Sequence, residues 1–203
     1  MKYHCRILFT TRSNLTGYAL FPLAEISDSS ALFELISAFY PEASEYKSVV
    51  KEIIEAVHRH TFAVKLTAKL LNNGILPPAQ LLRKLQEEKA ALENEDNIRI
   101  IKDGQSSKAT YYRHIHTLFS LYTLSEFQQN LISNMCFLPS SGLSARIFAN
   151  WMHLSNLNEI NDLIETDFIQ TNTRHTISLH PMIQEIALSE TQPSVSSCHI
   201  IYG

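Results

Sequence analysis

The sequence is poor in cysteine and lacks any long apolar run. Its three cysteines, Cys5, Cys136 and Cys198, are odd in number and far apart, a pattern typical of reduced thiols rather than of a disulfide framework or a CxxC-type zinc site. No apolar stretch approaches the roughly 20 residues of a membrane-spanning helix. The start, MKYHCRILF, has no apolar segment followed by a small-residue cleavage site, so no signal peptide is indicated. We therefore expect a cytoplasmic location and no membrane partner.

Also absent is an excess of positive charge. The formal net charge of -3 argues against a general surface for nucleic acid or anionic membranes. The 203 residues are 45% hydrophobic and 18% charged, which is ordinary for a packed protein of one domain or two small ones. No GxxxxGK followed by Ser or Thr, the phosphate-cradling P-loop, occurs in the chain.

The first half of the chain has the apolar spacing of helices. Residues 5–10 of CRILFTTR predict a strand that ends before Arg12. Helices are then predicted over 29–39 with Ser27 or Asp28 as N-cap, from Pro41 onward with an apolar stripe from Tyr46 to Val57, over 61–72, and over 78–88. Residues 89–107 are charged and polar, which predicts a connection between two compact units.

The second half of the chain has the element order of a winged helix. Helical spacing runs from Tyr111 to Tyr122, from a Ser125 cap to about Leu138, over 143–152 and over 156–166. Two β-rich runs then flank a turn near Asn172 to Arg174, and Pro181 stands where the first residue of a last helix is expected. Helices followed by a hairpin and one more helix predict a winged-helix domain.

Four stretches in fixed order carry a family resemblance. They are ILFTTR, the YALFPLAEISDSSALF that follows it, VVKEIIEAVHRHTFAVKLTAKLL, and ISLHPMIQEIA. Together they resemble the NB-ARC (STAND) nucleotide-switch ATPases of bacterial type, with the first similar to the family's sensor strand, the long third to its GLPLA-type helix and the last to its MHD-type position. The segments LFSLYTLSEFQQNLISNMCFLPSSG and FANWMHLSNLNEINDLIE resemble the winged-helix part. The likeness covers residues 5–190.

The resemblance implies a mainly α fold, with a helical subdomain, a winged-helix domain with a β-hairpin, and one strand left over from a P-loop α/β domain. The implied domains are a remnant of the nucleotide-binding domain (1–26), the helical subdomain (27–90), a linker (91–107), the winged-helix domain (108–190) and a tail (191–203). The family's P-loop and magnesium motif precede the sensor strand, so these residues resemble a fragment of a longer protein. Similar bacterial proteins often continue into tetratricopeptide repeats. Without a sheet beside it, we expect the segment 1–25 to be poorly anchored.

The resemblance also implies residues that bind nucleotide. Arg12 matches a sensor of the terminal phosphate, where a guanidinium makes paired hydrogen bonds; the alternative is a solvated arginine after an edge strand. His180 matches the histidine that donates to the inner phosphate of ADP in the resting form, whereas the alternatives are a histidine that caps its own helix or packs under the wing. The family's Asp after this histidine is Pro181 here, so a carboxylate that would orient the imidazole is absent.

Two further positions match contacts to the base. Thr61 stands where the family has the proline that lies against adenine, and Pro22 matches a position beside the base, although a turn before a helix explains it equally. The neighbouring Phe62, Ala63 and Leu66 are interpreted as core residues. His58 with His60, and His114 with His116, are two residues apart and point in different directions on a helix, so we expect no metal site.

The implied function is an ADP- and ATP-binding switch in signal transduction, with protein partners and self-assembly through the full-length protein. The parent would be a slow ATPase that needs Mg²⁺, while these residues alone are predicted to be inactive, with no catalytic residue. Alternatives are a winged-helix DNA-binding module and a helical protein-interaction module. DNA binding is disfavoured because the expected reading helix, 156–166, carries Glu159, Asp162 and Glu165 and no basic residue.

Overall fold

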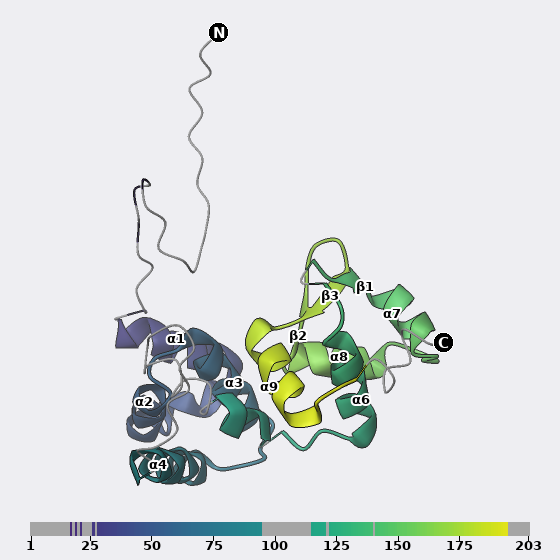
Figure 1. Cartoon of the computed structure of the whole chain (residues 1–203). Coiled ribbons are helices and arrows are strands. Elements are labelled where there is room, and N and C mark those ends of the chain that lie inside the picture. Colours follow the sequence, from purple (N-terminus) through teal and green to yellow (C-terminus); the bar gives the residue numbers. More distant parts are fainter. Residues whose placement is uncertain are drawn as a thin grey trace.

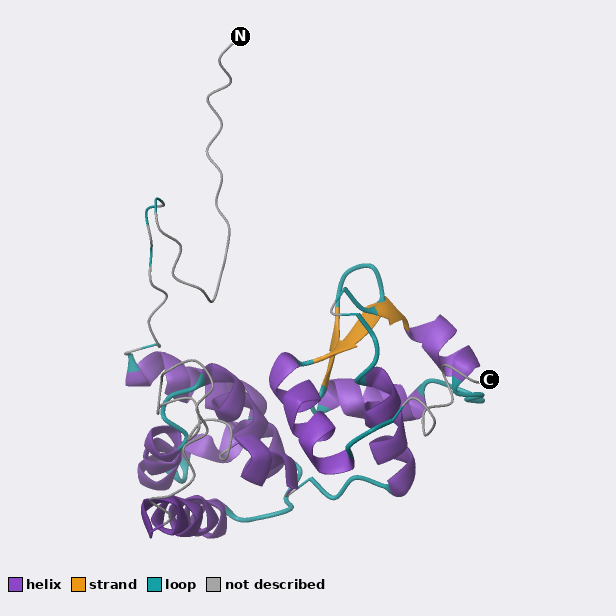
Figure 2. Ribbon diagram, viewed as in Figure 1, coloured by secondary structure: helices purple, strands orange, loops and turns teal. Residues whose placement is uncertain are grey.

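The computed structural model describes residues 28–94, 115–120, 122–139 and 141–194, with residues 17, 19, 21 and 26, and of 88–94 it describes only the backbone. The predicted strand 5–10, Arg12, Pro22 and most of the segment 1–25 lie outside the described residues. The described chain is mainly helical and contains a small antiparallel sheet of three strands (Figures 1 and 2). Within this part, none of the helices combines the length and hydropathy that a bilayer crossing requires.

The first helices confirm the capping prediction and correct one helix start. Helix α1 (Ser29–Phe39) follows Asp28, whose carboxylate accepts the Ser30 N–H at 2.8 Å. The single helix expected from Pro41 is wrong, because the chain forms a 3₁₀ turn, η1 (Pro41–Ser44), before α2 (Lys47–Ala56) begins. Tyr46 has a non-helical backbone between the two and is 42% exposed, so it does not belong to the apolar stripe. A proline at the start of a helix favours a tight first turn, and here that turn does not continue.

Helix α3 (Thr61–Asn72) has the predicted bounds, and α4 (Pro78–Asn94) is longer than the predicted 78–88. The residues EEKAALEN beyond 86 are good helix formers, and no glycine or proline interrupts them, so the helix continues past the point where the apolar stripe ends. The first four residues of the predicted linker 91–107 are therefore helical. Helix α1 packs on α3, and α2 packs on α4, which gives the N-terminal helices a shared core.

The C-terminal unit comprises α6 to α9 and the sheet. Its elements are α6 (Glu126–Met135), β1 (Leu143–Ser144), α7 (Ala145–Trp151), α8 (Asn158–Glu165), β2 (Ile169–Thr171), β3 (Thr176–Leu179) and α9 (Pro181–Thr191). Between these and α4, residues 115–120 are helical. The strand order is β1-β3-β2, with Leu143 opposite Ile177 and Ile169 opposite Leu179. The predicted hairpin and the helix that begins at Pro181 are confirmed (Figure 2).

Two predictions in this unit are corrected. The helix expected over 143–152 begins only at Ala145, because Leu143 and Ser144 pair with β3 as a short third strand. Gly142 makes that approach feasible: its φ is +78°, and a Cβ there would lie 2.7 Å from the Ile177 carbonyl oxygen. Helix α6 ends at Met135, three residues before the predicted end, although its Ser125 cap is present as a full capping box.

Candidate functional site

The N-terminal helices meet the C-terminal unit along one face of α3. Phe62, Lys65, Leu66 and Lys69 are three or four residues apart, so they line a single side of this helix. Each of them contacts a residue from beyond position 115, and Figure 1 shows α3 directly beside α9. We call this face, with the residues that it contacts, the α3 seam.

His180 lies at the end of the α3 seam where α3 begins, and it caps the N-terminus of α9. Its Nδ1 accepts the Met182 N–H at 3.2 Å, at the N-terminus of α9. One of the interpretations left open by the sequence, a helix cap, is therefore present. Because Nδ1 acts as an acceptor, the proton of the neutral ring lies on Nε2. The ring thus keeps one N–H donor that the cap does not use.

The two predicted motif positions, 119 residues apart, meet through Phe62. The rings of Phe62 and His180 are stacked, with centroids 3.5 Å apart and planes within 3°. Thr61, the first residue of α3, is exposed beside this stack, and His60 caps α3 through a 3.4 Å contact from the Ala63 N–H to its Nδ1. The N-termini of α3 and α9 therefore face a common junction. Ala63 and Leu66 are buried as predicted, and the Phe62 side chain is half-buried against the imidazole.

The surroundings of His180 keep it uncharged near neutral pH. Burial lowers the pKa of His180 from 6.5 to about 4, and the nearby His60 and Lys65 act in the same direction, while the Asp167 carboxylate opposes them. Positive charge around the junction thus disfavours a further proton on the imidazole. A neutral ring among basic groups can donate its Nε2–H to an anion without being an acid itself.

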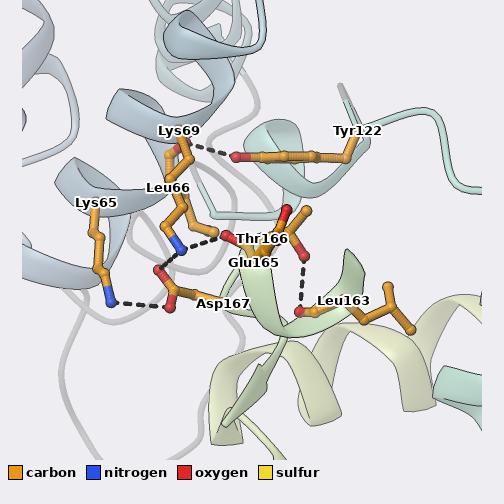
Figure 3. Close-up of polar contacts among 8 residues, drawn as sticks. All are labelled: Lys65, Leu66, Lys69, Tyr122, Leu163, Glu165, Thr166 and Asp167. Atoms are coloured by element: carbon orange, nitrogen blue, oxygen red, sulfur yellow. Dashed lines mark hydrogen bonds and ion pairs between the residues drawn. The ribbon is translucent and has the colours of Figure 1, made fainter. Parts of the chain in front are cut away.

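A cluster of ion pairs, which the sequence did not reveal, lies along the α3 seam beyond the Phe62–His180 stack (Figure 3). Lys65 Nζ lies 2.9 Å from Asp167 Oδ1, and Lys69 Nζ lies 2.8 Å from Asp167 Oδ2. Lys69 also donates to the Glu165 carbonyl oxygen at the end of α8. From the sequence alone, the acidic residues of α8 indicate only repulsion of DNA. Partners about 100 residues apart leave no local pattern, so spacing alone does not identify this contact.

The α3 seam also contains an aromatic cluster with one buried hydrogen bond. The Tyr122 hydroxyl donates to the Leu66 carbonyl oxygen at 2.8 Å. Its ring lies edge-on to Phe168 at 4.9 Å, and Phe119 lies 5.0 Å from the same ring. Burial, with the Asp167 charge nearby, raises the pKa of Tyr122 well above its ordinary range. The hydroxyl therefore stays protonated and remains a donor at all physiological pH values.

A separate groove lies between helical residues 115–120, α6 and α9. Its volume is about 330 Å³, and the pair of His116 Nε2 and Glu190 Oε1, 2.8 Å apart, lies on its wall. Neither Thr61 nor His180, the two predicted nucleotide-binding residues within the described part of the chain, lines it. Within the described ranges no three His, Cys, Asp or Glu side chains are grouped as metal ligands.

The structure thus brings together two of the four residues predicted to bind nucleotide. His180 stacks on Phe62, and Thr61 directly precedes Phe62 at the start of α3, whereas Arg12 and Pro22 fall outside the described residues. No protein-family model matches this chain, and no match was found among curated proteins or among solved structures.

Proposed function

We propose that this chain is the helical and winged-helix part of a nucleotide-dependent signalling switch of the NB-ARC (STAND) type, which binds ADP in its resting form. The observation that carries the proposal is the stack of Phe62 on His180. It brings α3, which resembles the GLPLA-type helix, and His180, which resembles the MHD-type histidine, to one junction, and this supports a nucleotide held by both segments. The resemblance alone specifies the order of these segments along the chain and not their contact.

The chemistry of the junction suits a phosphate. Two helix N-termini present backbone N–H groups and partial positive charge. The His180 Nε2–H is a neutral donor, and Lys65 contributes positive charge nearby, which the paired Asp167 carboxylate partly offsets. A hydrogen bond to a charged group contributes about 1.5–3 kcal/mol, which biases a switch but does not by itself bind a nucleotide tightly. High affinity would need a P-loop, which these residues do not contain.

The element order supports a winged-helix assignment for the C-terminal unit. Helices α6, α7 and α8 precede the hairpin, and β1 pairs with the hairpin's second strand. DNA reading by α8 is less compatible with the contacts than a switch role is. The C-terminal end of α8 is held against α3 by Lys69, its exposed side chains include Asp162 and Glu165, and Glu159 is half-buried. Turnover of ATP is assigned to the P-loop part, and none is expected from the 203 residues.

The proposal is tested first on the coding DNA. An in-frame strand, P-loop and helix within about 100–150 residues upstream, the size of one domain, is expected. The polypeptide extended to include it should bind fluorescent ADP. Absence of such a sequence, or failure of the extended polypeptide to bind ADP, would contradict the proposal.

The role of His180 is tested in that extended polypeptide with His180→Asn. Asparagine is a good N-cap, so α9 keeps its start while the Nε2–H donor is lost. We expect ADP affinity to fall about tenfold or more, as the loss of a hydrogen bond to a charged group predicts. His175→Asn, in the exposed hairpin turn, is the matched control and should bind as the wild type does. Equal ADP affinity of the two variants would show that His180 does not contact the phosphate.

A further inference from the structure

Asp167 occupies a position at which its backbone conformation is unfavourable for most residues. It follows the C-cap residue Thr166 of α8, and its φ is +64°. Helices commonly place glycine at this left-handed position, because a side chain there meets the backbone. An aspartate tolerates the conformation better than most residues, but at a cost that glycine does not have. A carboxylate at this point therefore suggests a contact that glycine cannot make.

The Asp167 carboxylate contacts two ammonium groups, which lie on successive turns of α3. Lys65 Nζ donates to Asp167 Oδ1 at 2.9 Å, while Lys69 Nζ lies 2.8 Å from Oδ2 without a well-directed hydrogen bond to it. Lys69 instead directs a donor to the Glu165 carbonyl oxygen, at the negative end of α8. One carboxylate and one helix end on the C-terminal unit are thus matched by two cations on the N-terminal helices.

The two lysines that pair with Asp167 also contact an aromatic ring of α1. Both ammonium groups lie over the ring of Phe39, the last residue of α1, at 5.1 Å and 5.4 Å from its centroid. Lys69 and Asp167 are 17% and 21% exposed, and Lys65 is 34% exposed. The charges are therefore partly withdrawn from water, which strengthens their attraction, yet water and salt still reach them.

We propose that Asp167, Lys65 and Lys69 form a charge latch that keeps the α3 seam closed, and that the two units separate when the latch is neutralised or screened. Lys65 lies one turn from Phe62 on the same side of α3, so the latch sits beside the Phe62–His180 stack. Opening the latch frees α8 and the residues after it to move away from α3. The charge latch depends only on these contacts and not on nucleotide binding, so its test is independent of the ADP-binding test.

The opening is measured as a distance between spin labels on the two units. Labels on Glu52→Cys in α2 and Glu185→Cys in α9 use exposed positions on either side of the α3 seam. Cys5→Ser, Cys136→Ala and Cys198→Ser remove the native thiols from this background. Double electron–electron resonance on the doubly labelled chain, at low salt and without nucleotide, should give one short, narrow distance distribution. Circular dichroism establishes that each variant keeps its helices.

The key variant is Asp167→Asn, which keeps the shape and tolerates the positive φ but removes the charge. We expect the longer-distance population to rise about tenfold, the lower end of the effect of a hydrogen bond to a charged group, because the site is partly exposed. Raising NaCl to 1 M should move the wild type in the same direction and Asp167→Asn very little. Asp162→Asn, on the exposed side of α8, is the matched control and should resemble the wild type.

Non-additivity separates the latch from a general charge effect. The variant Lys65→Gln/Lys69→Gln should open as Asp167→Asn does, and all three changes together should add little. The Lys65→Gln/Lys69→Gln variant also serves as the second test if Asp167→Asn does not fold. An unchanged distance distribution in the folded Asp167→Asn or Lys65→Gln/Lys69→Gln variant, or an equal change in Asp162→Asn, would overturn the proposal.

Discussion

The partly buried environment of His180 predicts a specific dependence of stability on pH. Its pKa is about 4 in the folded chain and 6.5 in its ordinary state. Above pH 6.5 the imidazole is neutral in both states, so the contribution of His180 to stability is complete. Between pH 6.5 and 4 the unfolded chain binds a proton that the folded chain does not, so stability falls as the pH falls. The window therefore lies on the acid side of neutrality.

The size of this effect follows from the two values. A pKa of about 4 in the folded chain and 6.5 in the unfolded chain lowers the free energy of unfolding by about 3 kcal/mol once His180 is protonated in both. His180 is only half-buried, so water screens part of the interaction, and we expect about 1–2 kcal/mol instead. Protonation would also convert Nδ1 from an acceptor to a donor, which breaks the cap to the Met182 N–H.

The assay is urea unfolding at a series of pH values from 7 to 4.5, with the variants His180→Asn and His175→Asn beside the wild type. His180→Asn keeps a helix cap and has no group that titrates in this window, so its stability should fall less steeply. His175→Asn removes an exposed histidine from the hairpin turn and should keep the wild-type slope. If His180→Asn loses stability with acid as steeply as the wild type, the His180 environment is not the cause and the reasoning fails.

Three further changes test the packing around the α3 seam and the sheet by urea unfolding at neutral pH. Tyr122→Phe should lower the free energy of unfolding by about 1 kcal/mol, because it deletes the buried bond to the Leu66 carbonyl and keeps the ring; no loss would show that this bond is not formed. Gly142→Ala should lower the free energy of unfolding more than Gly74→Ala does, since both glycines have positive φ but only at Gly142 would a Cβ meet the backbone. Equal decreases would contradict the close approach of β1 to β3. Ser125→Ala should cost about 1 kcal/mol through loss of the capping box, and a neutral effect would mean that α6 does not depend on it.

The sequence was informative wherever structure is local. Apolar spacing and caps located α1 and α3 to the residue, and the proline rule located the start of α9. The same local signals failed where a neighbour decides the outcome. Strand β1 exists because β3 lies beside it, and two residues cannot show a period of two on their own. Helix α4 extends beyond its apolar stripe because helix propensity persists after packing ends.

The candidate site divides in the same way. That His180 begins a helix was predictable, since Pro181 marks the first helical residue. That its ring stacks on Phe62 was not predictable from spacing, because the two rings belong to helices separated by more than 100 residues. The family resemblance predicts that Thr61 and His180 both lie near one nucleotide, and it predicts nothing for Lys65, Lys69 or Asp167.

A local rule that is broken can nevertheless point to a long-range contact. The C-terminal end of α8 reads Glu-Thr-Asp-Phe, with no glycine at the left-handed position that Asp167 occupies. Asp167→Gly should relieve the backbone while it removes both ion pairs, whereas Asp167→Asn removes the charge alone. If the carboxylate served only the helix end, glycine would be at least as stable and equally closed. A chain that is more stable with glycine but opens along the α3 seam would show that local stability is given up at Asp167 for control of the interface.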